Sequence, residues 1–252
     1  AAVIEVAPRF TPARYRVADC LLNLGDSEHA KTVYRSLAWH YIRSGHPLLG
    51  LALCKMVTAL DPRSSDLLEI LAELYSSESE RIAEGELPRP PPLPDGAPAP
   101  PVSNVPPAQL HASAARLAAD TEAITETPPN FPLVPLFSHL DEKTFIRVLH
   151  RLRLRRFQHD EVIIREGERG ESFFMLANGQ VTVWKLVEGR ETLGARLHQG
   201  AATEEKKTRY RSGSSATALK TASMPATLVS KTWANCSGVL SAIYRSARAP
   251  AP

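Results

Sequence analysis

The sequence predicts an α+β protein: an N-terminal array of α-hairpins, a proline-rich linker, and then a small β-barrel or jelly roll with flanking helices. Three observations predict this order. Apolar residues recur at helical spacing between Thr11 and Tyr75, proline dominates residues 87–107, and glycine punctuates short β-branched and aromatic runs after Glu161. A length of 252 residues allows one or two domains, and the linker favours two.

The composition argues against several classes of protein. With 43% hydrophobic and 23% charged residues, the chain is ordinary for a folded globular protein. A formal net charge of +3 is too small to indicate a nucleic acid or a membrane surface as partner. No apolar run approaches the roughly 18 residues of a membrane helix, and the first residues lack a basic leader. We therefore expect neither a membrane span nor a secretory signal.

The cysteines and histidines show no pattern of a metal or catalytic site. Cys20, Cys54 and Cys236 lie far apart, without the paired spacing of a zinc site or a disulfide framework. Such thiols are typical of a reducing compartment, which predicts a cytoplasmic protein. The eight histidines have no metal-ligand spacing, and none lies beside a recognisable nucleophile. We expect no metal site, no catalytic residue and no enzyme activity.

Four helices are expected in the N-terminal domain, residues 1–85. Thr11-Pro12 has the residue types of an N-cap and a first turn, and Gly25-Asp26 ends this helix and caps the next one. Ser44-Gly45-His46-Pro47 ends the second helix and opens the third, and a turn at residues 61–65 precedes the fourth. Short turns between amphipathic helices predict antiparallel α-hairpins.

The spacing in this array resembles the tetratricopeptide repeat family. The pattern of its first helix and closing proline is met by Tyr34, Leu37, Ala38, Tyr41 and Pro62, and it returns about 34 residues later at Leu68, Leu71, Ala72 and Tyr75. Gly50 and Cys54 depart from the family's preferred residues in the second helix. The resemblance implies a surface for a protein partner on residues 1–85. The alternative is a plain helical domain without a partner, since only one repeat and half of another are present.

Residues 86–107 are expected to link the two domains. Proline fixes φ and removes backbone donors, which predicts a semi-extended polyproline II spacer. Docking of these prolines into an aromatic groove of a partner is the less favoured alternative. The second domain is assigned to residues 108–202. It begins with an amphipathic helix over 108–126, and Asp141 then caps a further helix.

Strands are expected from residue 151 onward. Arginines alternate with apolar residues over 151–157, as in a strand whose arginines face solvent; a nucleic-acid patch is the weaker interpretation. Apolar runs at 162–165, 172–176 and 181–186 predict three more strands. The bends between them hold Gly167, Gly170 and Gly179, and Asn178-Gly179 predicts a hairpin.

This stretch resembles the first signature of the cyclic-nucleotide-binding domain family. The constrained positions of that signature are occupied by Ile163, Ile164, Gly167, Glu168, Gly170, Phe173 to Leu176, and Gly179. Pro135-Leu136-Phe137-Ser138 resembles the family's entry to the barrel, so the resemblance covers about residues 133–201. It implies a barrel that encloses cyclic AMP or cyclic GMP, and a sensor whose terminal helices repack on binding. The three glycines would shape the barrel corners.

The family's ligand contacts belong to the next segment, where this sequence departs from the pattern. A buried cyclic phosphate needs N–H donors at a helix start and an arginine, and the ribose hydroxyl needs a carboxylate. Residues 202–223 lack the family's glycine-glutamate pair and its arginine followed by a small residue and alanine. Glu204 and Arg211 are the nearest residues of the right charge and are the candidates for these contacts.

Residues 203–252 are expected to be a poorly ordered basic tail. They hold eight Lys or Arg against two Glu, and they are rich in Ser, Thr and Ala. Such a segment has little apolar area to offset its ordering entropy. An altered reading frame would explain this composition, as would a genuine basic tail that contacts anionic partners.

Together these features favour a regulatory protein of the cyclic-nucleotide-binding type with a helical protein-interaction domain. The alternative is an interaction scaffold in which the barrel is structural and binds no nucleotide. A DNA-binding regulator is a third class, but the sequence shows no helix-turn-helix.

Overall fold

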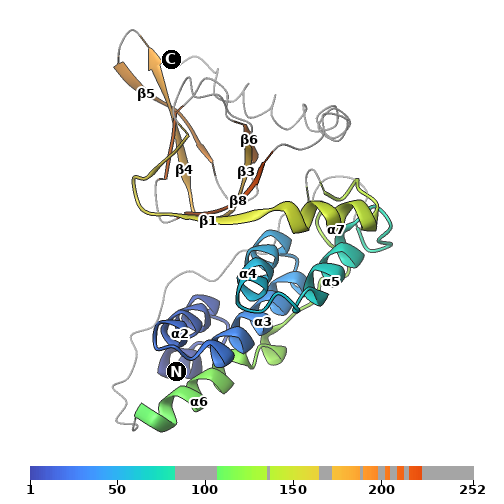
Figure 1. The fold of residues 1–252 in the computed structure, drawn as a ribbon, viewed down its shortest axis with the longest axis vertical. Helices are drawn as coiled ribbons and strands as arrows, with labels where there is room; N and C mark the ends of the chain where they lie inside the picture. Colours follow the sequence, from blue (N-terminus) through green and yellow to red (C-terminus); the bar gives the residue numbers. More distant parts are fainter. Residues whose placement is uncertain are drawn as a thin grey trace. The chain divides into compact units, whose positions relative to one another are not determined.

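The structure, a computed structural model, describes residues 1–82, 107–134, 137–164, 172–187, 190–197, 202–204, 209–212 and 216–222. The chain divides into two units (Figure 1). One is Ala1–Tyr75 with Ser79–Leu133, and the other is Ser76–Glu78 with Val134–Pro252. The first unit is helical and the second holds the strands, which confirms the predicted order of a helical region followed by a β domain.

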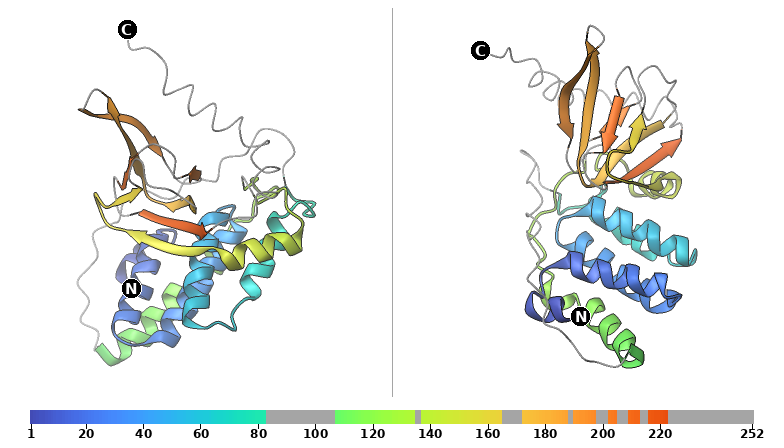
Figure 2. Two further views of the ribbon diagram at one scale, coloured as in Figure 1. Left: turned by 45° about the horizontal axis from the view of Figure 1, so that its top comes forward. Right: turned by 90° about the vertical axis from the view of Figure 1, so that its left-hand side faces the viewer.

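The helical unit is built from consecutive helices that lie side by side (Figure 2). These are α1 (Ala2–Val6), α2 (Thr11–Asn23), α3 (Ser27–Arg43), α4 (Pro47–Leu60), α5 (Asp66–Tyr75), α6 (Pro107–Ala119) and the 3-10 helix η1 (Glu122–Ile124). α3 packs against α2 on one side and α4 on the other, and α5 packs against α4. The four helices expected between Thr11 and Tyr75 are all present.

The turns of this unit follow the predicted residue types, with one exception. Gly25 and Gly45 adopt φ of 82° and 84°, a region that glycine enters without steric cost. The Asp26 carboxylate caps α3 by accepting the His29 backbone N–H at 3.3 Å. The predicted cap at Thr11 is wrong: Phe10 is the N-cap residue, and the Thr11 hydroxyl instead accepts the Tyr41 phenol at 2.9 Å. A tertiary partner has replaced the local cap.

α3 and α4 approach each other closely at Gly50. A Cβ atom on Gly50 would lie 2.6 Å from Ile42 Cγ1 and 3.2 Å from the Ile42 nitrogen, well inside van der Waals contact. Gly50 therefore occurs in the middle of α4 because the neighbouring helix leaves no room for a side chain. Ile42 also contacts α5, because the buried Tyr75 phenol donates to the Ile42 carbonyl at 2.7 Å.

α6 lies in the helical unit, whereas the sequence analysis placed residues 108–126 in the second domain. It packs against both α2 and α3. The buried Arg14 guanidinium donates to the carbonyls of Leu117 and Asp120, each at 2.6 Å, and so caps the carboxyl end of α6. The boundary between the units therefore falls near Leu133. The amphipathic pattern predicted the helix but could not indicate which partner would cover its apolar face.

The β unit begins with α7 (Glu142–Arg151), which the Asp141 carboxylate caps as predicted by accepting the Thr144 N–H at 2.9 Å. The strands are β1 (Arg153–Phe157), β2 (Val162–Ile164), β3 (Ser172–Asn178), β4 (Val181–Val187), β5 (Arg190–Leu197), β6 (Ala202–Glu204), β7 (Arg209–Ser212) and β8 (Ala216–Ala222). They form two four-stranded antiparallel sheets among the described residues, in the orders β1-β8-β3-β6 and β2-β7-β4-β5.

Strands β6, β7 and β8 correct the expectation of a poorly ordered tail from residue 203. β8 pairs with β1 on one side and β3 on the other, and β7 lies between β2 and β4. A strand with a neighbour on both sides gains ladder hydrogen bonds along both of its edges, and these backbone bonds do not depend on its side-chain composition. The Ser, Thr and Ala content misled the prediction for this reason. Residues 223–252 lie outside the described part of the chain.

The hairpin predicted at Asn178-Gly179 is also wrong, although the turn itself is present. Gly179 has φ of 93°, and the Asn178 side-chain oxygen accepts its N–H at 2.9 Å. However, β3 and β4 belong to different sheets, so the turn carries the chain from one sheet to the other. β4 instead pairs antiparallel with β5 and with β7. In β5 a bulge at Gly194 shifts the register, and Leu193 beside it is 44% exposed.

Candidate functional site

The described interior of the β unit, where the family resemblance places the ligand, is apolar. One cluster of buried side chains contains Leu176, Val181, Val183 and Leu197, and a second contains Phe157, Ile164 and Phe174. Both clusters draw on both sheets, and Ile163 packs against each of them. The Phe157 and Phe174 rings meet edge to face, with centroids 6.2 Å apart. These contacts form a core that holds the two sheets together.

The structure places the predicted barrel glycines and ligand contacts at separate points. Gly179 occupies the turn after β3, whereas Gly167 and Gly170 lie outside the described residues. Glu204 lies in β6 opposite Phe173, and Arg211 lies in β7 with Val162 and Thr182 as its register partners. Since β6 and β7 belong to different sheets, no strand ladder brings Glu204 and Arg211 together.

The chain has little room for a phosphate cassette between these two strands. β6 ends at Glu204 and β7 begins at Arg209, so only residues 205–208 separate them. One α-helical turn already uses 3.6 residues. The helix start that would present several N–H groups to a phosphate needs a longer insertion than this connection provides.

The predicted arginine strand is present from Arg153 onward, whereas Arg151, which the prediction included, is the last residue of α7. Arg153, Arg155 and Arg156 are exposed, whereas Phe157 in the same strand is 5% exposed. Because the adjacent Arg155 and Arg156 are both exposed, the strand does not alternate strictly between a buried and a solvated face. It supplies no aromatic side chain between the arginines on which a base could stack.

The helical unit contains a buried polar cluster that the sequence analysis missed. Its members are Thr11, Arg14, His40, Tyr41, His46 and Thr125. His40 Nδ1 lies 2.9 Å from the Thr125 hydroxyl, and the centroid of the Tyr41 ring lies 5.3 Å from that of His40 and 6.0 Å from that of His46. Arg14 shares a helical stripe with Ala18 and Leu21, which is the signal in the sequence that could have indicated its burial.

Burial controls the charge of this cluster. Burial lowers the pKa of His40 to about 4, with smaller contributions from the positive charge of Arg14 and from that of His46 when it is protonated. Burial also lowers the pKa of His46 to about 4, and His46 Nδ1 has no hydrogen-bond partner among the described residues. Both imidazoles are therefore neutral at pH 7. The pKa of the Tyr41 phenol is raised by burial, so it stays protonated and can donate to Thr11.

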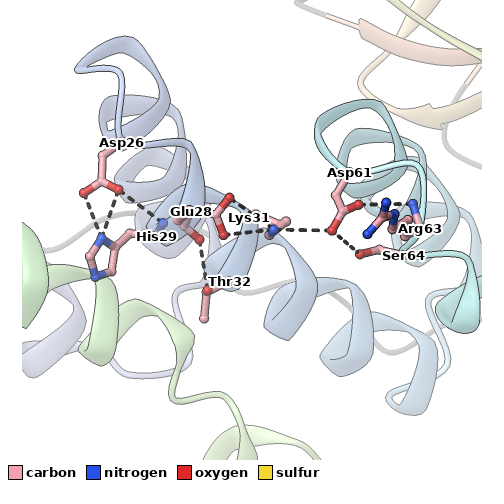
Figure 3. A network of polar contacts seen from close by, with 8 residues as sticks. All are labelled: Asp26, Glu28, His29, Lys31, Thr32, Asp61, Arg63 and Ser64. Atoms are coloured by element: carbon pink, nitrogen blue, oxygen red, sulfur yellow. Dashed lines mark hydrogen bonds and ion pairs between the residues drawn. The ribbon is translucent and has the colours of Figure 1, made fainter.

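A network of polar side chains joins the turns at one edge of the helical unit (Figure 3). Its members are Asp26, Glu28, His29, Lys31, Thr32, Asp61, Arg63 and Ser64. Lys31 contacts Glu28 at 2.9 Å within α3 and Asp61 at 3.4 Å beyond α4. A hydrogen bond from the Arg63 backbone, followed by those from Lys31 and Ser64, lowers the pKa of Asp61. The carboxylates of Asp26, Glu28 and Asp61 are thus engaged by groups of the helical unit itself, which indicates a structural role.

One helical turn after Lys31 in α3, Arg35 forms a bidentate ion pair with Asp66 at the start of α5. This pair and the Lys31–Asp61 contact both tie α3 to the chain after α4. Across the described ranges, no three His, Cys, Asp or Glu side chains lie close enough to hold a metal ion. The described helices also include none that is both long and apolar enough to span a membrane.

Comparison with known proteins matches part of the β unit to a family model. Residues 154–226 match the family model of the cyclic nucleotide-binding domain. A cAMP-dependent protein kinase regulatory subunit of Mycosarcoma maydis is 34% identical over 67 residues, which is 27% of this chain and 13% of that protein. The chain thus matches a small part of that relative's length.

Solved structures that are similar to part of this chain include two kinase regulatory proteins. The regulatory domain of Toxoplasma gondii PKA, crystallised with cAMP, is 23% identical with a TM-score of 0.33, over 34% of this chain and 36% of that chain. A regulatory subunit of a cAMP-independent protein kinase A from Trypanosoma cruzi, bound to guanosine, is 22% identical with a TM-score of 0.35, over 46% and 43%. 

The family match begins and ends later than the sequence resemblance, at residue 154 in place of 133 and at residue 226 in place of 201. It therefore includes strands β6 to β8, which the sequence analysis had assigned to the tail. Together with the two antiparallel sheets and their shared core, this match identifies residues 154–226 as a domain of the cyclic-nucleotide-binding family.

Proposed function

We propose that this chain is a regulatory module in which a barrel of the cyclic-nucleotide-binding type is joined to a helical, tetratricopeptide-like unit that binds a protein partner. The family match over residues 154–226 carries the proposal. The similarity to a kinase regulatory subunit over 67 residues supports a role in signalling. The stacked helices, joined to one another by ion pairs at their turns, support a rigid surface for a partner.

The barrel is proposed to bind cyclic AMP and cyclic GMP weakly or not at all. The short connection at residues 205–208 argues against a helical phosphate cassette. The candidate contacts Glu204 and Arg211 belong to strands of different sheets. A phosphodiester taken out of water without paired donors loses more hydration energy than its remaining contacts return.

Isothermal titration of the full chain with cyclic AMP and cyclic GMP tests this proposal. We expect no saturable heat below about 1 mM ligand, a limit that corresponds to about −4 kcal/mol of binding free energy. AMP serves as the matched control for nonspecific nucleotide binding. Saturable micromolar binding would overturn the weak-binding proposal and support a sensor. Glu204→Gln and Arg211→Met would then show whether these two residues carry it.

The second candidate function is an interaction scaffold whose barrel is purely structural. The filled core of Leu176, Val181, Val183 and Leu197 favours it, because these side chains occupy the space between the sheets. A partner that is captured by the full chain, is indifferent to cyclic nucleotide and is lost when residues 1–80 are deleted would support the scaffold. Release of that partner by cyclic AMP would exclude it.

A further inference from the structure

The helical unit has an open cavity of about 640 Å³ that the proposed function does not explain. It lies where α1, α2 and α6 meet, and its walls are mainly apolar, with Val3, Phe10, Val17, Leu21 and Leu24 among them. Leu24 is 63% exposed. A large aliphatic side chain this open to water, at the edge of an apolar cavity, is typical of an interaction site.

The cavity follows one face of α2. Ala13, Val17, Cys20 and Leu24 line it at the spacing of a helical stripe. The stripe extends over about 16 Å, which is three helical turns at 1.5 Å per residue. On its other sides, α2 packs against α3 and α6. Residues of α1 and α6 border this stripe, and the cavity between them is open to solvent.

The charge of the lining limits what can cover it. Arg16 and His111 are the basic side chains among the described wall residues, and no described Asp or Glu lines the cavity. Arg16 is exposed and has no acidic partner among the described residues. A second copy of this chain would bring two basic grooves together, which like-charge repulsion opposes. The complementary occupant is apolar along one side and acidic beside Arg16.

We propose that this groove binds an amphipathic helix of a protein partner, with a carboxylate of that helix facing Arg16. Apolar side chains at positions i, i+3, i+4 and i+7 of the partner helix would enter between α1, α2 and α6. The inference deepens the proposed function of the helical unit by naming the kind of partner. It does not depend on whether the barrel binds a nucleotide.

Cys20 gives a direct test, because this exposed thiol lies in the groove. The probe is a 16-residue helical peptide with leucine at the four apolar positions and glutamate beside them, prepared in three leucine registers. A scrambled peptide is the control. With full-length protein carrying Cys236→Ser, we expect the peptide to slow alkylation of Cys20 about tenfold at saturation and the scrambled peptide to have no effect.

A charge exchange then tests the contact with Arg16. Arg16→Glu should weaken binding of the glutamate peptide about tenfold, and a lysine version of the peptide should bind this variant as tightly as the original pair. Arg63→Glu, an exposed arginine at the turn before α5, is the matched control and should leave both affinities unchanged. Circular dichroism checks that each variant is folded.

Three results would overturn the proposal. One is alkylation of Cys20 that no peptide register slows. Another is an Arg16→Glu variant that binds the glutamate and lysine peptides equally. The third is protection of Cys20 that rises with protein concentration alone, which would assign the groove to self-association. None of these results depends on nucleotide, so they are distinguishable from a failure of the proposed barrel function.

Discussion

At the scale of single residues, Gly50 shows how packing overrides helix propensity. In an isolated helix, alanine at this position would be more favourable than glycine by about 1 kcal/mol. In this protein, however, the alanine Cβ would lie 2.6 Å from Ile42 Cγ1. Overpacking of this kind costs about 1–3 kcal/mol. We expect Gly50→Ala to lower the free energy of unfolding of the helical unit by about 1 kcal/mol, measured by urea denaturation followed by circular dichroism.

Ile42→Ala provides the control for this prediction, because it removes the atom that the new Cβ would meet. The double variant Ile42→Ala/Gly50→Ala should lose less stability than the sum of the two single variants. The new Cβ at position 50 would then occupy space that the shortened residue 42 has vacated. A Gly50→Ala protein that is more stable than the original would show that α4 shifts at no cost.

The thiols are a second case in which the residue environment decides the chemistry. Burial raises the pKa of Cys54 to about 12, whereas Cys20 is exposed. The thiolate is the reactive form, so we expect iodoacetamide at pH 8 to modify Cys20 and to spare Cys54 until the helical unit unfolds. Mass spectrometry of the digested protein measures both sites. Equal labelling of the two cysteines in native protein would contradict the packing of α4.

At the scale of elements, Arg14 decides where α6 belongs. Arg14 is 3% exposed, and its guanidinium donates to the carbonyls of Leu117, Ala118 and Asp120. Without it, these acceptors at the end of α6 lose a charged partner in a buried setting. We expect Arg14→Met to destabilise the helical unit by about 2–4 kcal/mol and to speed hydrogen exchange in α6.

Arg9→Met is the matched control, because Arg9 forms an exposed ion pair with Glu126 and surface pairs contribute little. It should change stability by less than about 0.5 kcal/mol. An Arg14→Met protein as stable as the Arg9→Met protein would mean that α6 is held by its apolar face alone.

The contact between α3 and the segment after α6 should weaken in acid. The pKa of His40 is about 4 in the folded protein, below about 6.5 in the unfolded chain, so the folded state excludes the proton. The contribution of the neutral His40 imidazole to the free energy of unfolding is fully present above about pH 6.5, and it is lost as the pH falls toward 4. His46, Arg14, Tyr41 and Thr125 surround this imidazole and offer it no acidic partner.

We expect the helical unit to lose about 2–3 kcal/mol between pH 7 and pH 4.5 through each of His40 and His46, measured by denaturation at each pH. His40→Gln should reduce this loss, because glutamine does not titrate. His29→Gln is the control, since His29 lies at the surface beside Asp26. A pH profile that His40→Gln leaves unchanged would assign the acid sensitivity to the carboxylates.

At the scale of the whole molecule, strands β6 to β8 decide whether the β unit folds. β8 separates β1 from β3, and β7 separates β2 from β4, so their loss divides both sheets. We expect a chain that ends at Ala201 to lose the β unit and to keep the helical unit. A chain that ends at Ala222 keeps every described strand and is the control.

Tryptophan fluorescence can follow the two units separately in these truncated chains. Both lack Trp233 and retain Trp39 in α3 and Trp184 in β4. With Trp39→Phe, the chain that ends at Ala222 should show a cooperative Trp184 transition in urea, and the chain that ends at Ala201 should show none. Equal transitions in both chains would mean that the shorter sheets suffice.

Prediction from sequence succeeded where the signal was local. The capping residue Asp26, the positive-φ glycines and the arginine strand before Phe157 each depend on a few neighbouring residues. It failed where the partner was distant. Thr11 pairs with Tyr41, α6 packs on α2, and the turn at Gly179 joins two sheets. The buried cluster around His40 was missed because its members come from separate elements.

The sequence by itself determined the order of the helical and β regions, most of the helix and strand positions, and the family signature around Gly179. Periodicity, capping and turn chemistry act over a few residues, and therefore remain visible in one dimension. Only the tertiary structure decided that β6 to β8 complete the sheets, that α6 joins the helical unit, and that an apolar groove with Arg16 lies open on α2. Sheet order and helix partners depend on contacts between residues far apart in the chain, which local patterns do not encode.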